Sequence, residues 1–192
     1  MHAEAYTVFE TAIGACAIAW SRHGIRALQL PESTPRRTVA RLRRHLPDAE
    51  PAQPPPAVRA AIDGIVALLA GEPIDLSGVQ LDETGIPAFE RSVYAVTRSI
   101  GPGATLTYGE IATRLGEPGA ARAVGKALGS NPFAVIVPCH RVLAAAGGIG
   151  GFSAGGGAVT KRRMLAIERA RVGDAPDLFE VERPPTRRLD LA

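Results

Sequence analysis

The spacing of apolar residues changes after about residue 30, and this change limits the fold more than any other feature of the sequence. Segments 6–12, 15–21 and 25–30 alternate apolar and polar residues and are rich in strand-forming types, with Gly14 between the first two. From residue 34 onwards the apolar spacing is that of helices. The sequence therefore predicts an α+β fold that opens with a small antiparallel sheet.

Two helices are expected directly after this sheet. Segment 34–46 has a helical stripe and begins at Thr34, a residue type that caps helix N-termini. Segment 58–69 has a clear period of 3.6 residues. A short strand is expected within 74–81. The sheet of the first domain should therefore be covered by helices.

A domain boundary is predicted at 82–87, where turn-forming residues interrupt the pattern. We expect an α/β domain of residues 1–85 and a mostly helical domain of residues 86–170. Residues 171–192 hold few apolar side chains and many prolines and acids, which predicts an irregular or disordered tail.

The helical domain contains a candidate DNA-binding motif. Segments 108–115 and 120–129 are both short helical patterns, and the turn 116–119 between them carries glycine. Thr107 is the expected N-cap of the first. Two such helices predict a helix-turn-helix of the winged type. Many small domains contain similar helix pairs without binding DNA, so the motif alone leaves both interpretations open.

Charge and cysteine content narrow the class of protein. Residues 1–86 hold 8 basic and 10 acidic side chains, whereas residues 87–168 hold 9 and 4. A basic second half suits a polyanion such as nucleic acid, although a solvated surface would give the same counts. Two cysteines do not make a disulfide framework, and no long apolar span is present. These features predict a cytoplasmic protein with no membrane contact.

Residues 134–142 are the candidate chemical centre. An apolar run ends at Pro138, which suits the first position of a helical turn. Cys139 would then lie where backbone N–H groups point outward, and their partial positive charge favours a thiolate. His140 could withdraw the thiol proton, either through a water or with a bend in the chain, because adjacent residues do not face each other. Arg141 adds positive charge.

The Pro-Cys-His-Arg-Val motif resembles the active site of the O6-alkylguanine-DNA alkyltransferases. Tyr108-Gly109-Glu110-Ile111-Ala112, segment 120–125, Asn131-Pro132 and segment 161–168 follow in the family's order and nearly its spacing. The resemblance is specific over residues 86–169 and looser before them. It implies irreversible transfer of an alkyl group from O6 of guanine in double-stranded DNA to the cysteine. It also implies a single turnover per molecule, no cofactor, and a monomeric protein.

The resemblance assigns the catalytic roles. Cys139 is the nucleophile, His140 its base, and Glu168 the buried carboxylate that orients the imidazole. Tyr108 is our candidate to protonate the departing guanine. Asn131 would join the second helix of the motif to the active-site turn. From the residues alone, Glu168 could equally be a surface partner of an arginine, and Asn131 a helix C-cap that adopts the left-handed conformation.

The resemblance also assigns the DNA-binding residues. Arg122 would fill the gap left by a flipped base, and Tyr108 would rotate the nucleotide out of the stack. The second helix is rich in small residues, which lets its backbone approach the minor groove with little sequence preference. A tight contact between helices would explain the small residues as well. The remaining expected contacts are Ala121, Ala123, Gly125 and Lys126.

The expected substrate pocket comprises Val137, Pro138, Phe152 and Ser153. Phe152 stands where family members usually have a tyrosine, and the glycine-rich loop before Lys161 is about two residues longer, so the accepted lesions could differ. This loop could instead be a plain linker. We expect no metal, because Cys16, His23 and His45 do not make a convincing ligand set.

Two other functions compete with alkyl transfer. Some relatives of the family bind alkylated DNA as lesion sensors and lack the cysteine, which is present here. A cysteine hydrolase would need an oxyanion hole and an acyl pocket, and the sequence shows neither clearly. Alkyl transfer is therefore the favoured interpretation, with the lesion sensor as the alternative.

Overall fold

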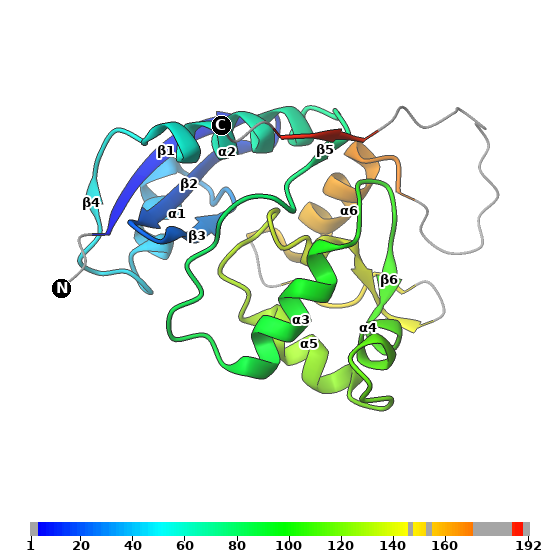
Figure 1. Ribbon diagram of the computed structural model, residues 1–192. Coiled ribbons are helices and arrows are strands. Elements are labelled where there is room, and N and C mark those ends of the chain that lie inside the picture. The colour runs from blue at the N-terminus through cyan, green and yellow to red at the C-terminus, as the bar shows by residue number, and fades with distance from the viewer. Residues whose placement is uncertain (1–3, 146–147, 153–154, 171–185, 190–192) are drawn as a thin grey trace.

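The computed structural model describes residues 4–145, 148–152, 155–170 and 186–189 (Figure 1). It confirms the predicted α+β fold. Strands β1 (Ala5–Thr11), β2 (Gly14–Ser21) and β3 (Gly24–Gln29) form an antiparallel meander, and β4 (Glu50–Pro51) pairs with β1 in parallel. The strand order is β3-β2-β1-β4. The three predicted strands are confirmed to within a residue or two at each end.

Two helices cover opposite faces of this sheet. Helix α2 (Pro56–Leu69) packs on the face that holds Cys16, Ile18 and Trp20 of β2. Helix α1 (Pro35–Leu42) packs on the other face, where β2 presents Ala17 and Ala19. Because successive side chains of a strand point to opposite faces, β2 is buried on both sides.

Helix α1 is shorter than predicted. Thr34 caps its first turn by accepting a hydrogen bond from the Arg37 backbone, as expected. The helix ends at Leu42, and residues 43–45 continue only as tighter turns, with Arg44 and His45 donating to carbonyls three residues back. Leu46 is still buried in the core, so the apolar pattern extends beyond the end of the helix and made the predicted helix too long.

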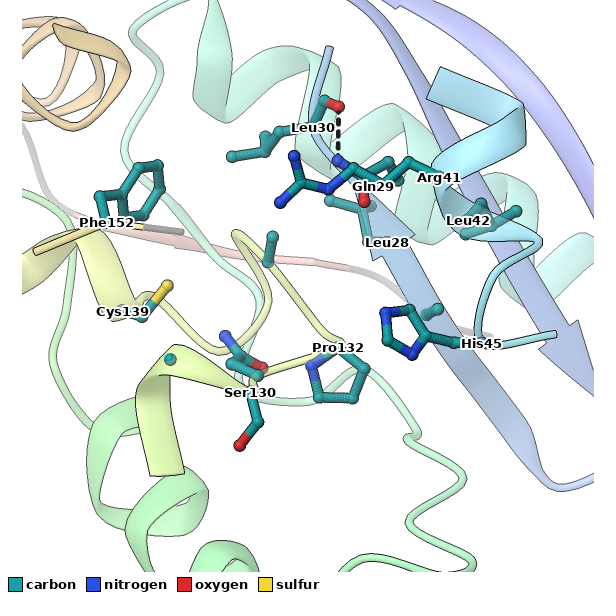
Figure 2. A pocket seen from close by; sticks show the side chains of 14 residues that line it. Leu28, Gln29, Leu30, Arg41, Leu42, His45, Ser130, Pro132, Cys139 and Phe152 are labelled. Carbon is teal, nitrogen blue, oxygen red and sulfur yellow. Dashed lines mark hydrogen bonds between the residues drawn. The ribbon is translucent and has the colours of Figure 1, made fainter. Parts of the chain in front are cut away.

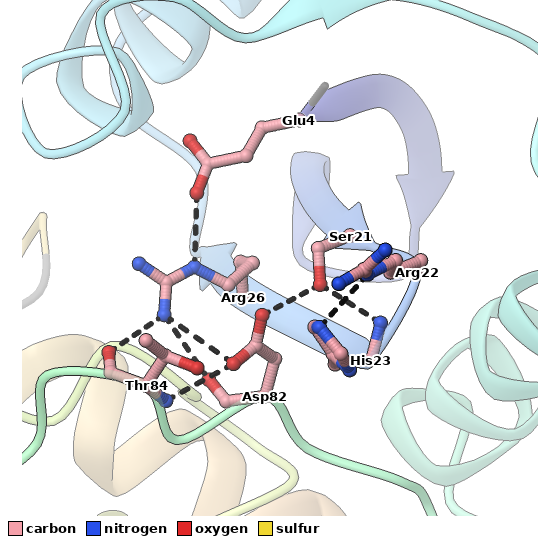
Figure 3. A network of polar contacts seen from close by, with 7 residues as sticks. All are labelled: Glu4, Ser21, Arg22, His23, Arg26, Asp82 and Thr84. Carbon is pink, nitrogen blue, oxygen red and sulfur yellow. Dashed lines mark hydrogen bonds and ion pairs between the residues drawn. The ribbon is translucent and has the colours of Figure 1, made fainter. Parts of the chain in front are cut away.

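The link between the two halves of the chain is held by a polar network around Asp82 (Figure 3). Its carboxylate accepts hydrogen bonds from Ser21 Oγ at 2.6 Å and from the Thr84 N–H at 3.0 Å, and it pairs with Arg26 at 3.7 Å. Arg26 also bonds Glu4 at 3.0 Å. Burial alone would raise the pKa of Asp82, but these partners outweigh burial and lower it to about 2.

The helical part of the chain follows. It contains α3 (Ala88–Arg98), α4 (Tyr108–Arg114), α5 (Ala121–Gly129) and α6 (Gly157–Ile167), with short strands β6 (Leu106–Thr107) and β7 (Val142–Leu143) paired in parallel. Tyr94 of α3 donates a hydrogen bond to the Ala127 carbonyl of α5 and meets Phe133 edge to face. These buried contacts fix α5 against the core.

Helix α6 begins at Gly157 and ends at Ile167. Gly156 and Gly157 adopt φ values of +79° and +51°, which let the chain turn into the helix. At the other end Arg169 adopts φ +53°, and the Ala170 N–H bonds the Leu165 carbonyl. The helix therefore stops at Ile167, and Glu168 lies at its C-cap.

The tail is more ordered at one point than its composition predicted. Strand β8 (Arg187–Arg188) pairs in parallel with β5 (Ile74–Asp75), and the Leu189 side chain lies against Gly64 of α2. The prediction of an irregular tail was wrong for this short stretch, because one apolar residue after the prolines suffices to dock it. The rest of the tail lies outside the described residues. Among those described, no helix is both long and apolar enough to cross a membrane.

Candidate active site and DNA-binding surface

The turn that leads to Cys139 is strained and held by Asn131. Val135 adopts φ +71°, a conformation that a β-branched residue rarely takes and that persists only where its surroundings impose it. Asn131 Nδ2 donates to the Val137 carbonyl and its Oδ1 accepts from the Phe133 N–H, both at 2.9 Å. Asn131 thus ties together both ends of the turn, and its expected place between α5 and the active-site turn agrees with this geometry.

The simpler alternative for Asn131 was wrong. The C-cap of α5 is Ser130, and the left-handed residues of the described chain do not include Asn131. The amide side chain, rather than a special backbone conformation, explains why asparagine stands here.

Cys139 opens a single 3₁₀ turn, η1 (Cys139–Arg141), and is half-buried. Pro138 precedes the turn as its N-cap, one position earlier than predicted. Burial raises the pKa of Cys139, although the Asn131 amide, the charge of Lys161 and the backbone N–H groups of the turn act in the opposite direction. The predicted resting thiolate was therefore wrong, since burial outweighs the positive end of one short turn.

His140 is fully buried and held by Glu168. Its Nε2 lies 2.9 Å from Glu168 Oε1. Burial lowers the pKa of His140 despite the opposing influence of Glu168, so the imidazole is neutral at physiological pH. An ionised carboxylate can only accept, so the proton must be on Nε2. Nδ1 is then an acceptor, and it is buried with no hydrogen-bond partner in the described part of the chain.

Glu168 is not a surface residue. Its side chain is 3 % exposed, and Arg141 Nε and Nη2 each donate to it at 2.8 Å. Burial would raise the pKa of Glu168, but His140 and Arg141 outweigh burial and lower it to about 2. The alternative that Glu168 is a surface partner of an arginine was wrong about the surface, although an arginine does pair with it. Glu168 is a buried carboxylate shared by a histidine and an arginine.

Arg141 has a role that the sequence did not reveal. Besides clamping Glu168, it donates from Nη1 to the Ile100 carbonyl at the end of the α3 segment. A charged side chain with this many partners fixes the carboxylate in one position. A signal was available in principle, because buried charges are usually paired and Arg141 directly follows His140 in the chain.

Lys161 and Tyr108 lie close together, and the charge of Cys139 influences the pKa of both. Lys161 is fully buried, donates from Nζ to the Val142 carbonyl at 2.6 Å, and lies 5.9 Å from the centre of the Tyr108 ring. Burial lowers the pKa of Lys161 and raises that of Tyr108. A Cβ on Gly150 would lie 3.2 Å from the Tyr108 hydroxyl, so only glycine lets this loop rest on the ring. Neither Lys161 nor Gly150 was assigned a functional role from the sequence.

The predicted helix pair is present as α4 and α5. A capping box starts α4, in which the Thr107 hydroxyl accepts from the Glu110 N–H at 3.1 Å and Glu110 accepts from the Thr107 N–H at 2.6 Å. The wing of the motif stays a prediction.

The outer face of α5 is open. Arg122, Ala123 and Lys126 are exposed, Ala121 and Gly125 are half-buried, and the inward face is formed by larger apolar residues and Ala127. A tight contact between helices therefore explains Ala127 but not Ala123. The expected DNA-binding residues lie on or beside one accessible face, and Gly125 lies next to the Tyr108 ring.

A cavity of about 380 Å³ opens beside Cys139 (Figure 2). Phe152 lines it, as expected, together with the end of α5. Val137 and Pro138 do not line this cavity, because both are buried within the turn that leads to Cys139. Ser153 lies outside the described residues. The opposite wall comes from β3 and α1, which the sequence did not predict.

Within residues 4–145, 148–152, 155–170 and 186–189, no three His, Cys, Asp or Glu side chains lie close enough together to hold a metal ion.

The fold and site define a class of protein, namely one in which a helix-turn-helix adjoins a half-buried cysteine backed by a histidine and a buried carboxylate. Residues 88–170 match the family described as 6-O-methylguanine DNA methyltransferase, DNA binding domain. The methylated-DNA–protein-cysteine methyltransferase of Mycobacterium tuberculosis is 44 % identical over 126 residues, which cover 66 % of this chain and 74 % of that protein. The protein of the same name from Methanothermobacter thermautotrophicus is 34 % identical over 151 residues, which cover 79 % of this chain and 77 % of that protein.

A solved structure supports the same assignment. The crystal structure of Mycobacterium tuberculosis OGT in complex with DNA superposes with a TM-score of 0.69 and 37 % identity, covering 88 % of this chain and 95 % of that one. The chain belongs to the methylated-DNA–protein-cysteine methyltransferase family. The resemblance drawn from the sequence motifs is thereby confirmed.

Proposed function

We propose that this protein repairs double-stranded DNA by transferring an alkyl group from O6 of guanine to Cys139, irreversibly and once per molecule. The observation that carries the proposal is a cysteine at the wall of a cavity, followed directly in the chain by a buried histidine that a buried glutamate holds. Cys139 lies at the cavity wall, a neutral His140 lies directly behind the cysteine in the chain, and Glu168 fixes the histidine tautomer.

The reaction is an in-line displacement at a saturated carbon, for which sulfur is a better nucleophile than oxygen. The Cys139 proton passes by way of a water to His140 Nδ1, the ring nitrogen that carries no proton. The S–C bond forms as the C–O6 bond breaks, and the guanine takes a proton from a neighbouring donor, for which we assign Tyr108. The thioether that results is not hydrolysed, so the protein is consumed.

The shifted pKa values suit a thiol and imidazole that react only when substrate is present. Burial raises the pKa of Cys139 and lowers that of His140, so the neutral pair is the resting state. When the proton moves, the imidazolium is stabilised by Glu168, whose pKa of about 2 keeps it ionised. Lys161 supplies a nearby positive charge that favours the thiolate.

The target atom is inaccessible inside a duplex, so the nucleotide must leave the stack. We assign Arg122 to the space that it vacates, and Tyr108 to guiding the nucleotide towards the cavity. Ala121, Ala123, Gly125 and Lys126 would lie along the DNA backbone. These roles are supported by the exposed face of α5 and by its nearness to Tyr108.

We further propose that residues 86–170 form the DNA-binding and catalytic unit, a division close to the matched range 88–170. The protein would act as a monomer in the cytoplasm, where Cys16 and Cys139 stay reduced as the free thiols seen here.

A stoichiometry experiment tests the proposal. The protein is mixed with duplex DNA holding one O6-methylguanine, and the lost lesion is counted against the protein added. One lesion per protein molecule, with no further turnover, is expected. The Cys139→Ala variant should bind the duplex and remove nothing. Binding without any loss of lesion by the unaltered protein would instead identify a lesion sensor.

A further inference from the structure

The cavity beside Cys139 is far larger than a methyl group. A methyl group is about the size of one water molecule, which occupies roughly 30 Å³ in the liquid. The cavity holds about 380 Å³, within the size range of sites that bind small molecules. It lies between two walls, one formed by the end of α5, the active-site turn and Phe152, and the other by β3 and α1.

The far wall of this cavity is formed by the N-terminal sheet and by α1. Leu28 and Leu30 of β3 give it an apolar surface, and Arg41 of α1 and His45 after it give it a basic end. In Figure 2 the Cys139 sulfur and the Arg41 guanidinium both point into the space beside Leu30. A group that starts at the sulfur therefore passes apolar side chains before it meets a cation.

Arg41 is held in this position by Glu32. Arg41 Nη1 donates to Glu32 Oε1 at 2.6 Å, and the Glu32 N–H donates to Thr38 Oγ1 at 3.0 Å. A Cβ on Gly155 would lie 2.8 Å from the Pro31 carbonyl and 3.1 Å from the Glu32 side chain. The glycine loop thus packs against the segment that anchors Arg41, which places the guanidinium where the loop and the sheet meet.

We infer that this cavity admits O6-alkyl groups longer than methyl whose far end carries a carboxylate, and that Arg41 selects them. The inference rests on the proposed alkyl transfer. The chemistry is unchanged: the S–C bond forms at the carbon attached to O6 and the C–O6 bond breaks, while the carboxylate stays intact. The guanidinium has five N–H donors in a fixed fork, a geometry that suits a carboxylate.

The test uses duplexes that carry O6-(ω-carboxyalkyl)guanine of increasing chain length. Each is compared with the carboxamide of the same length, which has the same size and no charge, and with O6-methylguanine. The rate of transfer to the protein is measured for each. At the best length we expect the carboxylate to react about tenfold faster than the amide, as a hydrogen bond to a charged group allows.

Two variants and a control locate the effect. Arg41→Gln should bring the ratio of carboxylate to amide rates close to one. Glu32→Gln should raise this ratio, because Arg41 would no longer be partly neutralised. Arg44→Gln alters an exposed arginine of the same segment that does not line the cavity, and it should keep the ratio. Thermal unfolding of each variant checks its fold.

The outcomes are separable. The inference is overturned if the protein accepts methyl and rejects every longer alkyl group. It is also overturned if the carboxylate and the amide react at equal rates, or if the carboxylate preference survives in Arg41→Gln. Each of these results leaves the proposed function intact. If no duplex donates an alkyl group, methyl included, the proposed function itself fails.

Discussion

His140 Nε2 lies 2.9 Å from Glu168 Oε1, and the same carboxylate accepts two hydrogen bonds from Arg141. Three N–H groups therefore converge on two oxygens in a buried site. Because both oxygens are used as acceptors, the histidine has one tautomer, and its free nitrogen is the one that can take a proton.

Glu168→Gln tests this arrangement. An amide has one acceptor oxygen and presents N–H donors in place of the other, so either His140 or Arg141 loses its partner. We expect transfer to slow roughly 10²- to 10⁴-fold, the usual contribution of a positioned base. Leaving buried Arg141 unpaired should also lower the free energy of unfolding by about 3–5 kcal/mol. Single-turnover kinetics and urea unfolding measure the two effects, and Glu117→Gln, an exposed glutamate, is the control. Unchanged kinetics would remove Glu168 from the mechanism.

Asn131→Ala should disconnect the active-site turn. The substitution leaves the Val137 carbonyl and the Phe133 N–H without their side-chain partner, beside a residue with φ +71°. The Phe133 N–H then loses its partner, which costs about 1–3 kcal/mol, whereas the Val137 carbonyl keeps its bond from the Cys139 N–H and loses only about 1 kcal/mol. We therefore expect a loss of about 2–4 kcal/mol in the free energy of unfolding. Ser130→Ala, one residue earlier, should cost less than half as much, and equal losses would contradict the account.

Arg122→Ala should separate base flipping from chemistry. The side chain is exposed on α5 and does not line the cavity beside Cys139, so transfer from free O6-methylguanine should be unaffected. Transfer from duplex DNA should fall at least about tenfold, since unstacking a nucleotide costs a few kcal/mol. Arg91→Ala on the exposed side of α3 serves as the control. Equal losses on base and duplex would exclude the role assigned to Arg122.

Asp82 should make the fold sensitive to acid. Its pKa falls from 3.8 to about 2 in the folded protein, so its contribution is complete above pH 4 and is lost as pH falls towards 2. We expect the unaltered protein to lose about 1–2 kcal/mol through this group over that interval. In Asp82→Asn this part of the loss should be absent. Urea unfolding at pH 6 and pH 3 measures it, with Asp63→Asn on exposed α2 as the control. The same acid-dependent loss in Asp82→Asn would show that the network in Figure 3 does not hold the linker.

Local patterns predicted most of the elements. The alternation in β1 to β3, the caps Thr34 and Thr107, and the period of α2 are properties of neighbouring residues. Element ends were less accurate, because α1 stops at Leu42 while the apolar pattern runs to Leu46, and α6 is positioned by backbone conformations at Gly156 and Arg169.

The site was predicted where a motif could be matched, and missed where distant segments meet. Cys139, His140 and Glu168 were identified through the resemblance. The roles of Arg141 and Lys161 depend on the carbonyls of Ile100 and Val142, which no spacing rule reveals. The direction of the Cys139 pKa shift was missed for the same reason, since burial is a property of the whole fold. The wall of the cavity formed by β3 and α1 likewise exists only when both halves of the chain pack together.

The mass of the peptide that carries Cys139 tests the central claim most directly. After incubation with an O6-methylguanine duplex, this peptide should gain one methyl group in place of one hydrogen. The Cys16 peptide should stay unmodified, because burial raises the pKa of that thiol to about 12. An unmodified Cys139 after all the duplex has been bound, or a methyl group found on Cys16 instead, would contradict the account.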